Sequence, residues 1–350
     1  MNWRLTRPLR AAGRLVIRLA IDTLAAHVQR FATKVDPMAT DPGRWGHSLG
    51  NLAELVIPCL QTAAAASVVE VGAYAGDVTR MLLEFSQASG ARIWSIDPDP
   101  QETLVALGAQ HSQLELVRRT SLQALPELAS ADAYVIDGDH NYFTVSEELR
   151  LIAASAEDMM PLLLCHDVGW PHARRDSYYS PAKIPDRHRQ PTVEGGYVFP
   201  GISGLHDGGL IYRWPAAQEG GPRNGVLTAI EDFLQDREDL RFALVPAFFG
   251  LGVIWSREAH YADALEAILD PWDRNPLVAR LEENRVLHLA AWQREAARAA
   301  WCQQRSASKD ALLRKLLESG TFALAVALSR LRQRGEPAYS KAEIRGLLSE

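Results

Sequence analysis

The chain has 350 residues, 47% of them apolar, so one large domain with appendages can bury a full core. Its formal net charge of −6 argues against a general nucleic-acid binder. Three cysteines without a C-x-x-C pair argue against a disulfide framework or a zinc site and favour a reducing, cytoplasmic location. No run reaches the ~18 to 20 apolar residues that a transmembrane helix needs.

The N-terminal segment 1–40 has a basic, amphipathic pattern. Arginines recur every three or four residues from Arg4 to Arg18, and no acid precedes Asp22. On a helix this spacing gathers the arginines along one stripe. We expect a helical extension that packs on the main domain with solvated arginines. Peripheral contact with an anionic membrane surface is the alternative.

The segment 68–77 predicts a buried strand that turns into a helix. It contains the acid Glu70, followed by Gly72 and Gly76 in the expected turn, and the next apolar run ends in Asp97. In open α/β sheets, ligands bind outside the carboxyl ends of the strands. An acid at the end of the second strand is placed to accept hydrogen bonds from ribose hydroxyls. The two runs together predict a nucleoside cofactor.

The glycine spacing separates two classes of cofactor. A dinucleotide fingerprint needs G-x-G-x-x-G, but Tyr74 and Asp77 stand where its second and third glycines would fall. Tyr74 would obstruct the approach of a pyrophosphate to the bare backbone. The E-x-G-x-x-x-G spacing instead resembles motif I of class I S-adenosylmethionine-dependent methyltransferases, whose cofactor has no phosphate. We favour that cofactor over a nicotinamide dinucleotide.

Two further strands are expected, and polar residues follow both of them at one edge of the sheet: Asp137, Asp139, His140, His166 and Asp167. With motif I, this IDGDH-x-Y … HD arrangement resembles the methyltransferase family that includes macrolide and other sugar O-methyltransferases and cephalosporin-hydroxylase-like proteins. The resemblance covers roughly residues 67–256. It implies a Rossmann-like class I methyltransferase fold, with a mostly parallel seven-stranded sheet and a closing antiparallel hairpin.

The alternation of strands and helices through Asp167 predicts a parallel sheet. Periodicity then disappears over 169–225, in an insert rich in Pro, Gly, Tyr and Arg. Irregular segments of this length inside a compact domain are usually functional or mobile, so we expect a lid or acceptor pocket here. Two strands at 242–247 and 252–256 would form the closing hairpin.

Three regions follow from this pattern. We expect a methyltransferase domain at 45–260, an N-terminal helical extension at 1–40 and a C-terminal helical extension at 261–350. The last of these has a Leu/Ala stripe and charged residues, typical of a dimerisation or packing element. We therefore expect a homo-oligomer.

The resemblance implies a cofactor site for S-adenosylmethionine. Glu70 would lie behind the turn and hold backbone amides or the methionine amine. Asp97 would bind the ribose hydroxyls, or would be only a loop acid before Pro98. The full set of expected cofactor-binding residues is Glu70, Gly72, Tyr74, Gly76, Asp97, Ser121 and Asp137.

Methyl transfer from a sulfonium is an in-line displacement, so the acceptor must be aligned with the methyl group and must lose its proton. His140 is the expected general base, because an unperturbed imidazole titrates near neutral pH. Asp139 is the second catalytic candidate. The alternatives are that His140 only orients Asp137 and that Asp139 caps the following helix.

In metal-dependent relatives the ligands fall at the positions of Asp137, His166 and Asp167. Many of those relatives have an acid or amide pair where this chain has His166 and Asp167. Imidazole is a poor ligand for Mg²⁺ and suits Mn²⁺, Fe²⁺ or Zn²⁺ better. The sequence therefore leaves open whether Mg²⁺, another divalent metal or no metal binds here.

The insert carries aromatic and basic side chains that suit a sugar with an anionic substituent: Arg174, Arg175, Tyr178 and Tyr179. A solvated loop is the alternative. We expect an O-methyltransferase that acts on a hydroxyl of a small, glycosylated or secondary-metabolite acceptor. The other possibilities are an oxygenase, with iron bound by His140, Asp137 and His166, and a cofactor-binding scaffold without turnover.

Overall fold

The computed structural model describes residues 47–332, so the predicted basic extension at 1–40 lies outside the described residues. The chain divides into two units, of which the first continues through Ala290 and the second begins at Ala291. The first unit therefore extends past the domain end predicted near residue 260. Residues 262–269 form a helix whose Leu265 and Leu269 are buried in the core of the first unit.

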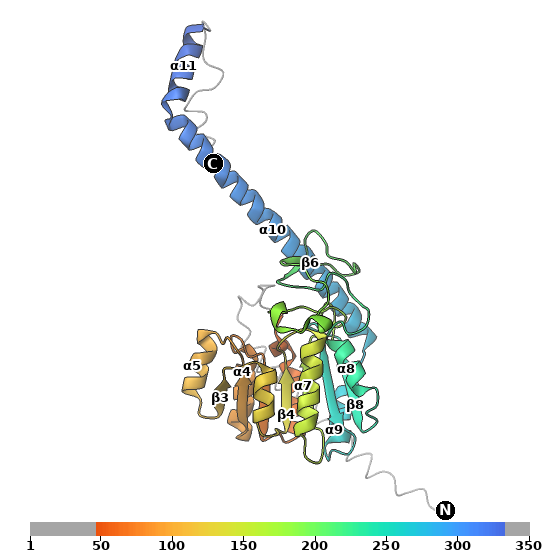
Figure 1. Ribbon diagram of the computed structural model, residues 1–350. Helices are drawn as coiled ribbons and strands as arrows, with labels where there is room; N and C mark the ends of the chain where they lie inside the picture. The colour runs from red at the N-terminus through yellow and green to blue at the C-terminus, as the bar shows by residue number, and fades with distance from the viewer. Residues whose placement is uncertain (1–46, 333–350) are drawn as a thin grey trace, which may run out of the picture. The chain divides into compact units, whose positions relative to one another are not determined.

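Seven strands of the first unit form one sheet in the order β3-β2-β1-β4-β5-β9-β8 (Figure 1). The first five are parallel, and β9 runs antiparallel to both β5 and β8. The bounds are β1 Ser67–Val71, β2 Arg92–Ile96, β3 Leu114–Val117, β4 Ala133–Ile136, β5 Leu162–His166, β8 Leu240–Val245 and β9 Leu251–Ser256. The predicted Rossmann-like class I methyltransferase fold, closing hairpin included, is confirmed. Its strand order reverses between β1 and β4, the place where open α/β sheets bind ligands.

Helices cover both faces of this sheet, which explains why its central strands are continuous apolar runs. One core cluster joins the sheet to α3, α4 and α9, and the other joins it to α6, α7 and α8. The helix bounds are α3 Ala53–Thr62, α4 Asp77–Ser89, α5 Glu102–Gln110, α6 Ser121–Ala124, α7 Tyr142–Ser155, α8 Val226–Leu234 and α9 Ala262–Leu269. Short 3-10 turns lie at Leu49–Leu52 and Leu125–Glu127.

The insert after β5 is folded around its own polar core. It contains the two-stranded sheet β6 (Gly196–Val198) and β7 (Leu210–Tyr212), and 3-10 turns at Pro181–Lys183 and Asp186–His188. The carboxylate of Asp176 is fully buried.

Asp176 fastens the insert to the starts of α7 and α8. Its Oδ1 accepts hydrogen bonds from the backbone N–H of Tyr142 (2.8 Å) and of Gly225 (2.7 Å). Its Oδ2 accepts the hydroxyl of Tyr178 (2.7 Å). The neighbouring backbone N–H of Ser177 donates to the carbonyl of His140 (2.8 Å). One buried side chain thus joins the insert to two helices.

The part of the second unit that the structure describes is helical. Helix α10 (Pro276–Glu318) crosses the boundary between the units, and α11 (Gly320–Arg332) follows it. None of the described helices combines the length and the apolar character needed to cross a bilayer. The dimerisation role expected of this tail stays a prediction.

Candidate active site

Gly72 brings the loops after β1 and β4 into direct contact. Its φ is +88°, and its N–H donates to the carbonyl of Ile96 (2.9 Å). A Cβ built on Gly72 would lie 2.2 Å from the carbonyl oxygen of Asp137 and 2.4 Å from the Cα of Gly138. Only glycine fits here, because the space that a side chain would need is filled by the backbone that carries Asp137. Gly76, with φ +84°, begins α4.

Asp97 stabilises the motif I turn from the end of β2. Its Oδ2 accepts the N–H of Tyr74 (2.7 Å), and its Oδ1 accepts the N–H of Asp99 (2.8 Å). Tyr74 has φ +41° and a ring that is 64% exposed, so the ring does not fill the turn. A carboxylate oxygen can accept more than one hydrogen bond, so Asp97 keeps acceptor capacity for a ribose hydroxyl, and the predicted ribose contact stays a prediction.

Glu70 is buried between the turn and the sheet. Its Oε2 accepts the hydroxyls of Thr79 (2.7 Å) and Ser95, which ties α4 to β2. The prediction that Glu70 holds backbone amides of the turn is therefore wrong. Burial raises the pKa of Glu70 to about 7, and the charges of Asp137 and Asp97 act in the same direction. Its Oε1 has no hydrogen-bond partner among the described residues and is left for another donor.

The loops after β4 and β5 converge as expected. His166 Nδ1 lies 2.9 Å from Asp137 Oδ1, and His166 Nε2 lies 2.8 Å from the carbonyl oxygen of Phe248. His140 Nε2 lies 3.1 Å from Asp167 Oδ2 and 3.8 Å from Asp137 Oδ1. Imidazoles and carboxylates therefore alternate around one small polar site at the carboxyl edge of the sheet.

This geometry can be compared with known proteins. Residues 69–168 match the family model described as "Methyltransferase domain". The matched segment runs from β1 to the residue after Asp167, so it contains both the motif I turn and the imidazole–carboxylate site.

Solved methyltransferase structures are also similar to this chain. They include SAH-bound PaMTH1 of Podospora anserina, with 16% identity, 74% of this chain and 100% of that chain covered, and a TM-score of 0.39. A Geobacter sulfurreducens methyltransferase has 13% identity and a TM-score of 0.38, and the match covers 67% of this chain and 96% of that chain. An O-methyltransferase family protein of Burkholderia thailandensis has 15% identity and a TM-score of 0.38, and the match covers 60% of this chain and 56% of that chain. No curated protein matched the chain.

The carboxylates of the imidazole–carboxylate site raise the pKa values of its two histidines. Burial lowers the pKa of His140, but the charges of Asp167 and Asp137 outweigh it and raise that pKa to about 9. The same two carboxylates raise the pKa of His166 to about 10 against the effect of burial. Burial raises the pKa of Asp137, but the imidazoles outweigh it and lower that pKa to about 2. Without a further cation, both imidazoles are charged at neutral pH.

The donor set at Asp137, His166 and Asp167 fits a divalent ion. Their ligand atoms lie within 4.8 Å of one another. Because a carbonyl oxygen only accepts hydrogen bonds, the contact to Phe248 places a proton on His166 Nε2. The other nitrogen, Nδ1, then faces the carboxylates, and such an outer hydrogen bond is typical of metal-binding histidines.

Sequence reasoning missed His172. Its ring is 3% exposed and lies 4.6 Å from the ring of His140, at an interplanar angle of 43°. The edge of Tyr212 packs against it at 4.7 Å. Burial lowers the pKa of His172 to about 3. The only signal was a third histidine shortly after the strand-end pair His166 and Asp167.

Sequence reasoning also missed Glu148, on α7. This residue is fully buried, and neither carboxyl oxygen has a hydrogen-bond partner among the residues that the structure describes. Burial raises its pKa to about 8, and the nearby Ser121 hydroxyl opposes this. Ser121, predicted to contact the cofactor, is itself buried at the start of α6.

Asp139 does not cap α7, because the N-cap is Asn141, whose side chain accepts the N–H of Thr144 (2.9 Å). One oxygen of Asp139 accepts the Thr144 hydroxyl (3.1 Å), and the other accepts the N–H of Tyr179 (3.4 Å). Burial raises the pKa of Asp139. The catalytic role expected of Asp139 stays a prediction.

Three of the four predicted acceptor residues have structural partners instead. Arg174 pairs with Glu231 on α8 (2.5 and 2.7 Å). The guanidinium of Arg175 is buried and donates to carbonyls within the insert, and Tyr178 is buried with its hydroxyl on Asp176. Arg175 and Tyr178 are thus held inside the insert, and the acceptor role predicted for all three residues stays a prediction.

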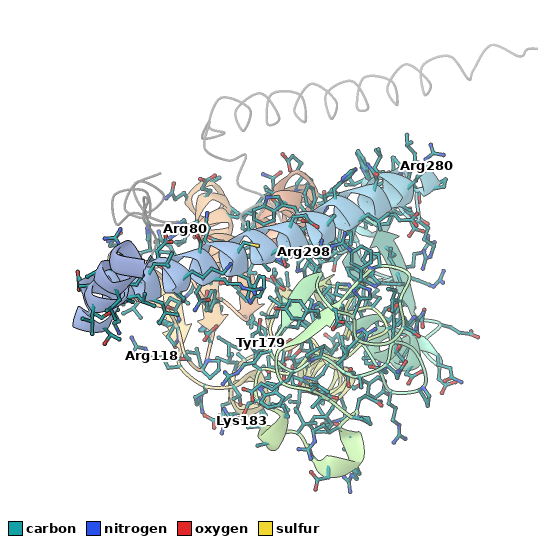
Figure 2. All side chains as sticks on the ribbon, turned by 90° about the horizontal axis from the view of Figure 1, so that it is seen from above. Arg80, Arg118, Tyr179, Lys183, Arg280 and Arg298 are labelled. Carbon is teal, nitrogen blue, oxygen red and sulfur yellow. The ribbon has the colours of Figure 1, made fainter. Side chains whose placement is uncertain are left out.

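Only Tyr179 among the predicted acceptor residues presents an open ring. It is 63% exposed, and the rings of Tyr179 and His140 meet edge-on at 5.8 Å. Figure 2 labels Tyr179 in the view from above. Its place beside His140 is compatible with the predicted acceptor contact.

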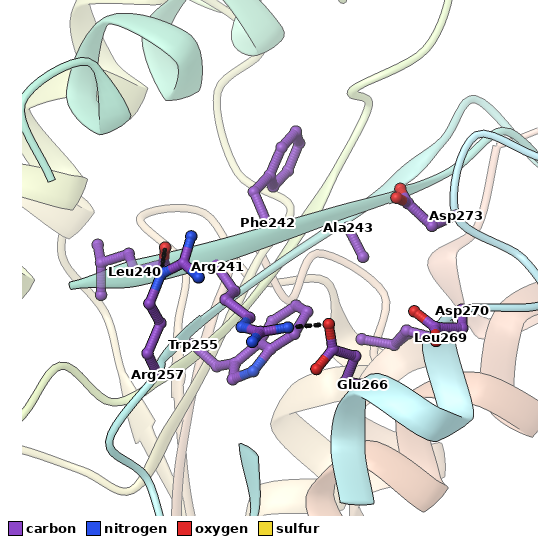
Figure 3. A pocket seen from close by; sticks show the side chains of 10 residues that line it. All are labelled: Leu240, Arg241, Phe242, Ala243, Trp255, Arg257, Glu266, Leu269, Asp270 and Asp273. Atoms are coloured by element: carbon purple, nitrogen blue, oxygen red, sulfur yellow. Dashed lines mark hydrogen bonds and ion pairs between the residues drawn. The ribbon is translucent and has the colours of Figure 1, made fainter. Parts of the chain in front are cut away.

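A hollow of about 230 Å³ lies elsewhere in the methyltransferase fold, lined by residues of β8, β9 and α9. Figure 3 shows Arg241 paired with Glu266 across it. Its lining contains no residue of the imidazole–carboxylate site. We therefore do not assign it to the reaction.

Proposed function

We propose that the chain is an S-adenosylmethionine-dependent O-methyltransferase that acts on a small hydroxylated molecule. The observation that carries this proposal is the position of the His140–Asp167 pair at the carboxyl edge of the sheet, beside the carboxyl groups that follow β2 and β4, where the strand order reverses. A site at this place in the sheet can hold a cofactor while a base reaches an acceptor hydroxyl at the reactive end.

The charge at this edge of the sheet suits this cofactor. S-adenosylmethionine carries a sulfonium and an ammonium cation, and three carboxyl groups lie close together here, those of Glu70, Asp97 and Asp137. The unpartnered Oε1 of Glu70 offers an acceptor to a cationic donor. Asp97 would also accept hydrogen bonds from the ribose, beyond those it receives from the turn.

His140 would act as the general base. Asp167, 3.1 Å from Nε2, would hold a proton on that nitrogen, and the free Nδ1 would take the proton of the acceptor hydroxyl; Asp167 would then stabilise the imidazolium that forms. With a pKa of about 9, His140 is unprotonated only in alkaline solution. A divalent ion held by Asp137, His166 and Asp167 would acidify the hydroxyl and offset the carboxylate charge that keeps His140 protonated.

The proposed acceptor is a sugar-containing molecule or another secondary metabolite. The exposed face of Tyr179 would pack against a sugar ring near His140. Because Arg174 and Arg175 have other partners, an anionic substituent is no longer part of the proposal. Location in the cytoplasm, assembly as a homo-oligomer and membrane contact through residues 1–40 are proposals from the sequence alone.

Calorimetric titration with S-adenosylhomocysteine tests the cofactor. We expect micromolar binding by the wild type and at least tenfold weaker binding by Asp97→Ala. The matched control is Asp99→Ala, which removes an exposed acid of the same loop and should leave the affinity unchanged. Absence of binding in a folded protein would overturn the proposal.

Transfer of a labelled methyl group to a panel of glycosylated metabolites tests the reaction. His140→Gln should abolish transfer and keep cofactor binding, and retained transfer would reject His140 as the base. Cofactor binding without transfer to any acceptor would favour the scaffold. A requirement for iron and 2-oxoglutarate would favour the oxygenase.

A further inference from the structure

We propose that His140, Asp167 and His172 form a separate binding site for a first-row transition ion such as Zn²⁺ or Co²⁺. Each side chain offers one ligand atom, and these atoms lie within 4.8 Å of one another. The site lies beside the set Asp137, His166 and Asp167 and shares only Asp167 with it. Neither the sequence pattern nor the proposed reaction assigns a role to His172.

One ring nitrogen of His172 has no hydrogen-bond partner in the described part of the chain. This nitrogen, Nδ1, is buried, and ring contacts with His140 and Tyr212 hold the imidazole in place. A buried nitrogen that loses water without gaining a partner costs about 1–3 kcal/mol. A buried imidazole with an unpartnered nitrogen, next to a second imidazole and a carboxylate, is typical of a metal-binding site.

The donor types select the class of ion. Two imidazoles and one carboxylate suit Zn²⁺, Co²⁺ or Fe²⁺, whereas Mg²⁺ prefers oxygen ligands. His166 belongs to the neighbouring set, because its two nitrogens face Asp137 and Phe248. Asp167 Oδ2 lies 3.1 Å from His140 Nε2 and 3.8 Å from His166 Nδ1, so the same carboxylate oxygen faces both sets and is nearer to the new one.

The backbone supports this assignment for Asp167. Its φ is +60°, a left-handed conformation that non-glycine residues rarely adopt and that clusters at functional sites. The side chain, which is almost fully buried, is thereby held between His140 and His166. A carboxylate fixed between two imidazoles can serve either ion set.

An ion in this site would occupy the lone pair of His140. If His140 is the base, which rests on the proposed function, such an ion would stop methyl transfer. Zn²⁺ would then inhibit the same enzyme that another divalent ion assists.

Titration of the EDTA-treated full chain with Co²⁺, followed by visible absorption, tests the site without any acceptor. We expect His172→Ala to weaken Co²⁺ binding at least tenfold and to lose the absorption band of the bound ion. His166→Ala should keep the band. The control His260→Ala, which removes an exposed histidine, should bind as the wild type does. Unchanged Co²⁺ binding by folded His172→Ala would overturn the proposal.

X-ray absorption of the Zn²⁺-loaded wild type gives a test that needs no variant. The proposed site predicts two imidazole ligands, and the neighbouring set predicts one. A count of one would overturn the proposal even if His172→Ala failed to fold. Both measurements are independent of S-adenosylhomocysteine binding, so failure of the proposed function would be seen separately.

Discussion

Replacement of Gly72 by alanine should destabilise the protein by about 2–5 kcal/mol. The φ of +88° costs about 1–2 kcal/mol once a Cβ is present. The new Cβ would also lie 2.2 Å from the carbonyl oxygen of Asp137 and 2.4 Å from Gly138 Cα. These are backbone atoms that cannot rotate away, and overpacking of this kind costs typically ~1–3 kcal/mol. The two costs together give the expected loss.

The assay is urea unfolding followed by circular dichroism, with Gly90→Ala as the matched control. Gly90 ends α4 with φ +78°, and a Cβ there would meet nothing within 4 Å. We expect this control to lose only the conformational part, about 1–2 kcal/mol. Equal losses in the two variants would refute the argument, because they would show that the loops after β1 and β4 separate at no cost.

Two further variants probe buried carboxyl groups. Because burial raises the pKa of Glu148 to about 8, the folded state keeps a proton that the unfolded chain loses above its ordinary pKa of about 4.3. As pH rises from about 5 to 8, this difference lowers the free energy of unfolding of the wild type by up to ~1.4 kcal/mol per pH unit. Glu148→Gln has no such proton to lose, so its melting temperature relative to the wild type should rise over the same pH window. A constant difference would contradict the burial argument. Asp176→Ala leaves the amides of Tyr142 and Gly225 without an acceptor, so their hydrogen exchange should quicken at least tenfold, whereas Asp176→Asn, which keeps an acceptor oxygen, should change it less. Unchanged exchange in Asp176→Ala would show that Asp176 does not fasten the insert.

The sheet could be predicted because its strands are short, continuous apolar runs that end in glycine or acid. The closing strands expected at 242–247 and 252–256 are observed at Leu240–Val245 and Leu251–Ser256. Parallel strands also bring their carboxyl ends to one edge, which is why the approach of His166 to Asp137 followed from sequence alone. The compact unit extends past the domain end expected near 260, because burial of Leu265 depends on contacts far away in the chain.

The insert could not be predicted in the same way. Without helical or strand periodicity, nothing in the sequence distinguishes a buried arginine from a solvated one. Arg175 donates to carbonyls 28 and 41 residues away, and these partners exist only in the folded insert. His172 was missed for the same reason, because its neighbour His140 lies on another loop.

The hydrogen bonds made by Asp176 and Ser177 restrict movement of the insert relative to His140. The Asp176 carboxylate accepts hydrogen bonds from the N–H groups at the starts of two helices, and the adjacent Ser177 N–H donates to the carbonyl of His140. Outward movement of residues 176–177, the root of the insert, would break these hydrogen bonds and move His140 away from Asp167. The root of the insert therefore keeps the imidazole of His140 aligned with Asp167.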